Sequence, residues 1–108
     1  MASGEGSHAE GYGAHAEAKG SHAEGSETTA SKEGAHAEGV ESTASGRAAH
    51  AEGEKTTAAG DKSHAEGAGA YAWGHYTHAE GNGTQARGRA SHVEGRFNVL
   101  DKTAKDKD

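Results

Sequence analysis

Small and polar residues alternate along the chain in a pattern that repeats every seven residues. Alanine fills the third position of each unit from Ala9 to Ala86, and Val93 takes its place in the last unit. The position two residues earlier is always Ser, Thr or Ala, from Ser7 to Ser91. Polar residues stand between and after these two positions, so small and polar side chains point to opposite sides of an extended chain. The pattern predicts short β-strands with one small-residue side and one polar side.

A seven-residue period is also typical of a coiled coil, but the glycines exclude that structure. The fifth position is Gly in eleven of thirteen units, with Ala18 and Lys32 as the exceptions. A coiled coil needs large apolar residues at two of seven positions, and each Gly in a helix costs about 1 kcal/mol relative to Ala. We therefore expect no helix, and we expect the Gly to end each strand at a tight corner.

The polar position between the two small ones shows that the true period is fourteen. From Ala23 onward it alternates between His and another residue, as in Thr29, His36, Thr43 and His50. Two strands and two corners then make one coil, and stacked coils make a parallel β-solenoid with strands about 4.8 Å apart.

The predicted interior is thin, because its columns contain only Ala, Ser and Thr. The chain has one Leu, no Ile and three Val, so it has no second core. Burial of a methyl group contributes only about 0.8 kcal/mol, against an ordering cost of about 1–2 kcal/mol per residue. We therefore expect further surface to be buried between chains in a homo-oligomer.

The composition of the chain limits the classes of function that it can have. At 108 residues and a net charge of −6, the chain reads as one domain with no electrostatic basis for binding nucleic acid. It has no apolar run of 18 residues, so no membrane insertion is expected. Ser, His and acidic residues are abundant, but each occupies a position that is repeated many times, and no unique nucleophile, base and orienting group stand out. We expect neither an enzyme nor a cofactor.

Three segments are predicted. Residues 1–6 form a lead-in or the edge of an excised fragment, residues 7–95 form the repeat domain, and residues 96–108 form a capping segment and a frayed junction. In the last segment we expect Phe97, Val99 and Leu100 to close the open end of the solenoid, because an uncovered strand edge invites pairing with another chain.

The amino-acid sequence of the repeated units resembles known repeats. Ser-His-Ala-Glu-Gly at residues 21–25 and 63–67, with Thr-Ala units between, is similar to the head repeats of trimeric autotransporter adhesins of the YadA type. It also resembles repeats in tail-fibre proteins of phages and prophages, where an exit like His92 to Asn98 follows the array. The resemblance implies a left-handed parallel β-roll of 14-residue coils, assembled as a homotrimer.

The His and Glu columns should stack as two parallel ladders on one outward face. Six stacked His suggest a metal site, but adjacent coils about 4.8 Å apart are too far for one ion held at about 2.0–2.1 Å from each nitrogen. We predict no metal and interpret the face as an inter-chain contact. Its candidates are His22, Glu24, His36, Glu38, His50, Glu52, His64, Glu66, His78, Glu80, His92 and Glu94.

Aromatic residues gather in one coil and suggest a ligand surface. Tyr71 and Trp73 should point outward on the variable face, Tyr76 should lie at the next corner, and Arg87 follows one coil later. Such a platform suits a sugar or a peptide. The alternative is that these rings pack against neighbouring coils or another chain.

Three functions remain open. The first is a structural, non-catalytic segment of a phage or prophage tail fibre, extracellular on the virion, with neighbouring fibre domains and a host-surface glycan or protein as partners. The second is the head of a trimeric adhesin on the bacterial surface. The third is an ice-binding solenoid, suggested by the column of Thr29, Thr43 and Thr57.

Overall fold

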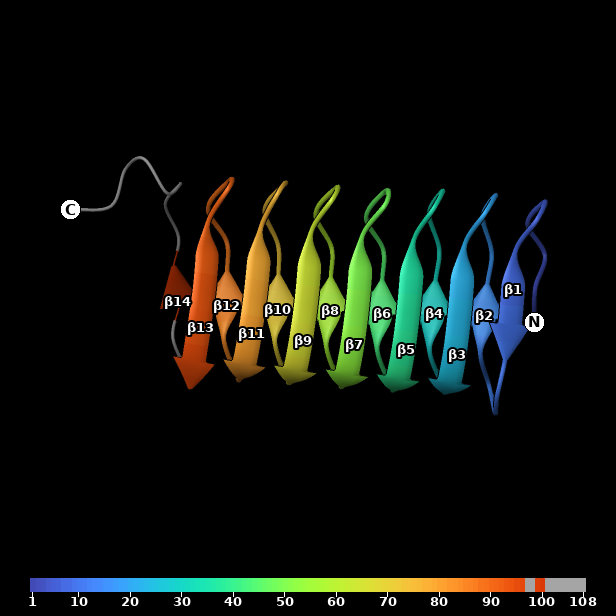
Figure 1. The fold of residues 1–108 in the computed structure, drawn as a ribbon, viewed down its shortest axis with the longest axis horizontal. Helices are drawn as coiled ribbons and strands as arrows, with labels where there is room; N and C mark the ends of the chain where they lie inside the picture. The colour runs from blue at the N-terminus through green and yellow to red at the C-terminus, as the bar shows by residue number, and fades with distance from the viewer. Residues whose placement is uncertain (97–98, 101–108) are drawn as a thin grey trace.

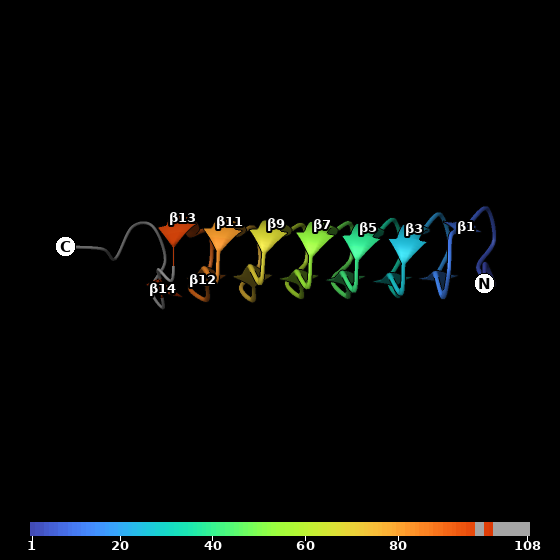
Figure 2. The ribbon, with the colours of Figure 1, turned by 90° about the horizontal axis from the view of Figure 1, so that it is seen from below.

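The chain forms a flat spiral of short strands. The computed structural model describes residues 1–96 and 99–100, and all its regular structure in that part is β. Fourteen strands alternate between two parallel seven-stranded sheets, which lie back to back (Figures 1 and 2). The HAEG sheet, named after its repeated residues, contains β1 (His8–Glu10), β3 (His22–Ser26), β5 (His36–Val40), β7 (His50–Glu54), β9 (His64–Ala68), β11 (His78–Asn82) and β13 (His92–Arg96). The second sheet contains β2 (His15–Ala16), β4 (Thr29–Ala30), β6 (Thr43–Ala44), β8 (Thr57–Ala58), β10 (Tyr71–Ala72), β12 (Gln85–Ala86) and β14 (Val99–Leu100).

Strand pairing confirms the fourteen-residue coil. His22 pairs with His36 in the HAEG sheet, and Thr29 pairs with Thr43 in the second sheet. Each strand therefore meets its equivalent fourteen residues on, which is the parallel β-solenoid that the alternation predicts. The molecule measures 44 × 22 × 10 Å along its principal axes.

The interior is as thin as the composition requires. Apart from three Gly, the buried residues in the described part of the chain are Ala, Ser and Thr, together with Val93, and Thr28, Thr56 and Thr84 are the largest fully buried side chains. Several hydroxyls are paired locally, since Ser63 donates to the carbonyl of Gly60 at 2.6 Å. Thr56 donates to Ser42 at 3.0 Å, and Ser42 donates to the carbonyl of Gly53 at 3.1 Å. The Oγ1 atoms of Thr28 and Thr84 have no hydrogen-bond partner.

The prediction that the fifth-position Gly ends every strand is wrong for the HAEG sheet. Gly25, Gly39 and Gly53 lie inside five-residue strands, with φ between 106° and 110°. A Cβ on Gly39 would lie 2.0 Å from the carbonyl oxygen of Gly53, so Gly is needed here because the coils approach closely. In the second sheet the prediction holds, because Gly46 and Gly60 follow two-residue strands.

The corners are instead made at the seventh position of the unit, which the sequence shows as variable. Every seventh position from residue 13 to residue 90 has a left-handed φ, between 55° and 70°. Gly occupies some of these positions, whereas others hold Glu, Ala, Lys or Tyr, as at Glu41, Lys55 and Tyr76. Because these positions hold several residue types, a search of the sequence for glycine does not identify them as corners.

Both ends continue the pairing beyond the expected repeat domain. Ala2 forms a parallel bridge with Ala16, and β14 pairs with β12. The predicted closure by Phe97, and by the side chains of Val99 and Leu100, concerns residues outside the described part or side chains that are not described. In residues 1–96 and 99–100 the structure has no helix long and apolar enough to cross a membrane.

Candidate functional site

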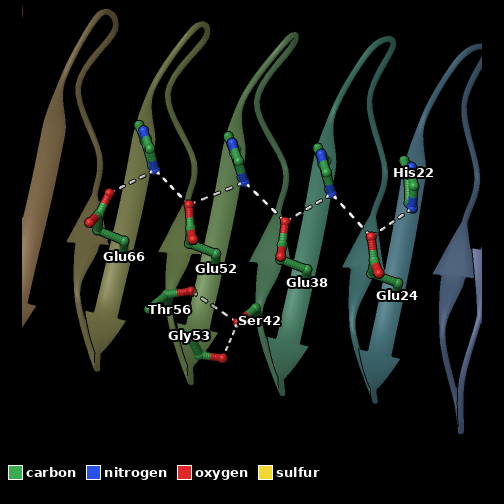
Figure 3. Close-up of polar contacts among 11 residues, drawn as sticks. His22, Glu24, Glu38, Ser42, Glu52, Gly53, Thr56 and Glu66 are labelled. Atoms are coloured by element: carbon green, nitrogen blue, oxygen red, sulfur yellow. Dashed lines mark hydrogen bonds and ion pairs between the residues drawn. The ribbon is translucent and has the colours of Figure 1, made fainter.

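The predicted His and Glu ladders form on the outer face of the HAEG sheet. Parallel pairing places each His directly beside the His of the next coil, because their Cα atoms are in register. From His36 to His92 the rings stack with centroids 4.6–4.7 Å apart and planes within 3° of parallel. The sheet therefore presents one continuous column of imidazoles (Figure 3).

The two ladders are interleaved and not merely parallel. Oε1 of Glu38 lies 3.1 Å from Nε2 of His36 and 3.5 Å from Nε2 of His50. Oε1 of Glu52 repeats this between His50 and His64, at 3.5 and 3.2 Å. The result is a zigzag of alternating nitrogen and oxygen along the sheet (Figure 3). We call it the His–Glu ladder, and its members are His8, Glu10 and the twelve residues predicted as inter-chain contacts.

The ladder is half-buried even in a single chain. In its central coils about a third of each His side chain is exposed, as for His50 at 35%, and Glu52 is 39% exposed. The Nε2 atoms of His22, His36, His50 and His78 are shielded from solvent yet make no aligned hydrogen bond, although Glu oxygens lie nearby. Polar atoms left in this state are costly, whereas Nε2 of His64 and Nε2 of His92 each make a hydrogen bond of 3.2 Å with a Glu Oε1.

A second column of charges follows one edge of the solenoid at residues fourteen apart. Lys19 pairs with Glu5 at 3.9 Å, and Arg47 pairs with Glu33 at 3.3 Å. The backbone N–H of Arg47 donates to Oδ1 of Asp61 at 3.0 Å, and this hydrogen bond holds the pKa of Asp61 below its ordinary value of 3.8. These contacts fix neighbouring coils in register at the edge.

The aromatic candidates divide into two places. Tyr71 and Trp73 stack on each other on the second sheet, with centroids 4.5 Å apart and planes 10° from parallel. In the next coil Nε of Arg87 donates to Oε1 of Gln85 at 2.9 Å, and Gln85 pairs with Tyr71. Half of Trp73 is exposed, so this face offers rings beside a guanidinium and an amide.

Tyr76 belongs to a separate environment at the corner. Lys62 and Arg89 each place their charged group 5.6 Å from the centre of its ring, which is cation–π range. Tyr76 thus contacts residues of the neighbouring coils, and 51% of it is exposed. The threonine column of Thr29, Thr43 and Thr57 is in register, and Tyr71 ends it.

The fold and its ladders define a repeat protein of the parallel β-solenoid class. Residues 37–63 match the YadA head domain repeat, in two copies. This match confirms the resemblance to YadA-type head repeats that the sequence of the units indicates. The matched stretch covers most of β5 through β8, and the same pairing register continues on both sides of it. No curated protein matches the chain.

Proposed function

We propose that the chain is a structural, non-catalytic segment of an extracellular trimeric fibre that contacts a target surface. The match to YadA head repeats supports an adhesin-like role and self-association. The repetition of His and Glu in every coil supports a structural and not a catalytic use of these residues. In this proposal the roll is left-handed, as in the resemblance.

The HAEG sheet is the proposed face between chains, and the single observation that carries this is its uniformity. Each coil offers one imidazole and one carboxylate in the same place, with about a third of each His side chain exposed, so a second copy of the same sheet can match this repeat coil by coil. A core of Ala, Ser and Thr leaves the isolated chain with little apolar burial, so association also adds stability.

The second sheet is then left to face the target. Its outer face varies from coil to coil, and Tyr71, Trp73 and Arg87 give it an aromatic and hydrogen-bonding surface suited to a glycan or a protein. Neighbouring fibre domains are the other proposed partners.

Two kinds of fibre fit. The Ser-His-Ala-Glu-Gly spelling favours a phage or prophage tail fibre, which is our first assignment, whereas the matched repeat favours the head of a bacterial surface adhesin. Location follows the assignment, on the virion or on the bacterial surface.

Binding to intact bacterial and host cells, followed by a glycan array, tests the contact surface. We expect Trp73→Ala to reduce binding at least tenfold with the solution mass unchanged. Tyr12→Ala, which removes an aromatic ring that is 80% exposed near the other end, is the matched control and should bind normally. Equal binding by Trp73→Ala and the unmodified chain contradicts the assignment of this surface.

A further inference from the structure

The His–Glu ladder is also a repeated set of metal-ligand donors, in addition to its proposed role between chains. In each step, one ring nitrogen from each of two consecutive His and a carboxylate oxygen of the intervening Glu lie within 4.8 Å of one another, as for His36, Glu38 and His50. Two imidazoles and one carboxylate are the ligands of many zinc sites, in which the fourth position stays open.

The state of the nitrogens favours a cation over a simple hydrogen-bonded ladder. Nε2 of His22, His36, His50 and His78 makes no aligned hydrogen bond and is shielded from water. Yet each lies within 3.0–3.7 Å of a Glu Oε1. A metal ion between nitrogen and carboxylate would use the nitrogen lone pair and the negative charge together.

The spacing between coils is too wide for a shared ion if the His rings are held fixed. A small movement of the rings removes this obstacle. Two nitrogens on one tetrahedral Zn²⁺ are about 3.4 Å apart at bonds of about 2.05 Å. The stacked rings are 4.6–4.7 Å apart at their centres, so two neighbours must tilt together by about an ångström at their tips. The ring tips lie on the outer side of the sheet and take no part in the backbone pairing, so the tilt leaves that pairing unchanged.

We propose that the His–Glu ladder binds divalent transition-metal ions, with Zn²⁺ as the reference ion, each held by two consecutive His and the Glu between them. Because one Nε2 serves one ion, the seven His of the ladder hold at most three ions per chain. The sites then lie two coils, or about 10 Å, apart, and the carboxylates offset the repulsion between ions. This inference goes beyond the proposed function, because counting bound metal does not depend on the number of chains.

Equilibrium dialysis of the full chain against Zn²⁺ at pH 7.5, with metal analysis of the protein fraction, tests the proposal. We expect two to three Zn²⁺ per chain. The triple variant His22→Gln, His50→Gln, His78→Gln leaves no two adjacent His in the ladder, so bound Zn²⁺ should fall at least fivefold. The control His15→Gln, His75→Gln removes His outside the ladder and should bind as the unmodified chain does.

Nuclear magnetic resonance of the unmodified chain keeps the proposal testable if the triple variant does not fold. Zn²⁺ should shift the imidazole signals of the ladder and leave those of His15 and His75 in place. Less than half an equivalent of bound Zn²⁺, equal shifts at all nine His, or undiminished binding by a folded triple variant would overturn the proposal.

Discussion

At the scale of single residues, the fold depends on small side chains in the interior and on the absence of a side chain where coils approach closely. The interior accepts nothing larger than Thr or Val, and the HAEG sheet requires Gly where neighbouring coils nearly touch. Glycine therefore has two separate uses in the unit. At the fifth position of the HAEG strands it avoids a steric clash, and at the seventh it only eases a left-handed corner that other residues also adopt.

Gly39→Ala should destabilise the protein by about 3 kcal/mol, because the new Cβ would lie 2.0 Å from the carbonyl oxygen of Gly53. Gly20→Ala should cost only about 1 kcal/mol, since φ is 67° there but no atom lies within 4 Å of the added Cβ. Urea unfolding of both variants measures the difference. Equal losses would mean that the close approach of the coils is not what selects Gly39.

Thr84→Val should stabilise the protein by about 1 kcal/mol, because it replaces a fully buried hydroxyl that has no partner. Thr56→Val should have the opposite sign and a similar size, since the Thr56 hydroxyl donates to Ser42 at 3.0 Å. Thermal unfolding distinguishes them. Destabilisation by both changes would show that Thr84 has a partner in solution.

At the scale of elements, strands of two to five residues are stable only as members of a column. His stacks on His and Ala on Ala through fourteen-residue register, and the charges at the edge pair from one coil to the next. Each contact is small, and repetition is what fixes the register. The His–Glu ladder adds alternating charge to the same column, so its response to acid depends on both residue types.

The variant Glu38→Gln, Glu52→Gln, Glu66→Gln should become sensitive to mild acid. Protonated imidazoles stacked less than 5 Å apart repel one another, and this variant has no carboxylates between them to offset the repulsion. Between pH 8 and pH 5.5 we expect the melting temperature of this variant to fall by about 5 °C more than that of the unmodified chain.

The control for this experiment is Glu27→Gln, Glu41→Gln, Glu54→Gln, which removes the same charge outside the ladder. It should follow the unmodified chain across the same pH range. If the two triple variants behave alike, net charge and not the ladder controls the response.

Asp61→Asn tests the charges at the edge. Because its pKa is lowered in the folded chain, Asp61 stabilises the fold above the ordinary value of 3.8, and this contribution is lost as the pH falls through the folded value. The unmodified chain should therefore be more stable than Asp61→Asn at pH 6, and the difference should vanish near pH 2. A difference that is the same at both values contradicts the role of the Arg47 N–H.

Much of the arrangement of strands could be predicted from the sequence, because residues that stack in one column recur at a fixed spacing along the chain. The period of fourteen, the small-residue core and the outward His and Glu all follow from alternation. The seventh-position corners could not be predicted, because Glu, Lys, Ala and Tyr adopt the same φ as Gly there. Nor could the interleaving of the His–Glu ladder, since it depends on side-chain rotamers, or the separation of Tyr76 from Tyr71 and Trp73.

At the scale of the whole molecule, the chain is a flat spiral with two different faces. One face repeats the same imidazole and carboxylate in each coil, and the other changes along its length. A face that never varies fits contact with copies of itself, whereas a varied face fits recognition of something else.

The pair His50→Asp, His64→Asp should therefore dissociate the assembly, because it puts additional negative charge among the Glu of the HAEG sheet. The matched pair Thr43→Asp, Thr57→Asp adds the same charge on the second sheet and should leave the assembly intact. Size-exclusion chromatography compares the two. Dissociation by the second pair alone would assign the inter-chain contact to the second sheet.

The solution mass of the unmodified chain, by light scattering coupled to size exclusion near neutral pH, tests the central claim most directly. We predict a mass three times that of the 10.9 kDa chain, with the HAEG sheets buried between copies. A stable, folded particle of 10.9 kDa would contradict the account, because the Ala, Ser and Thr core would then suffice without any partner.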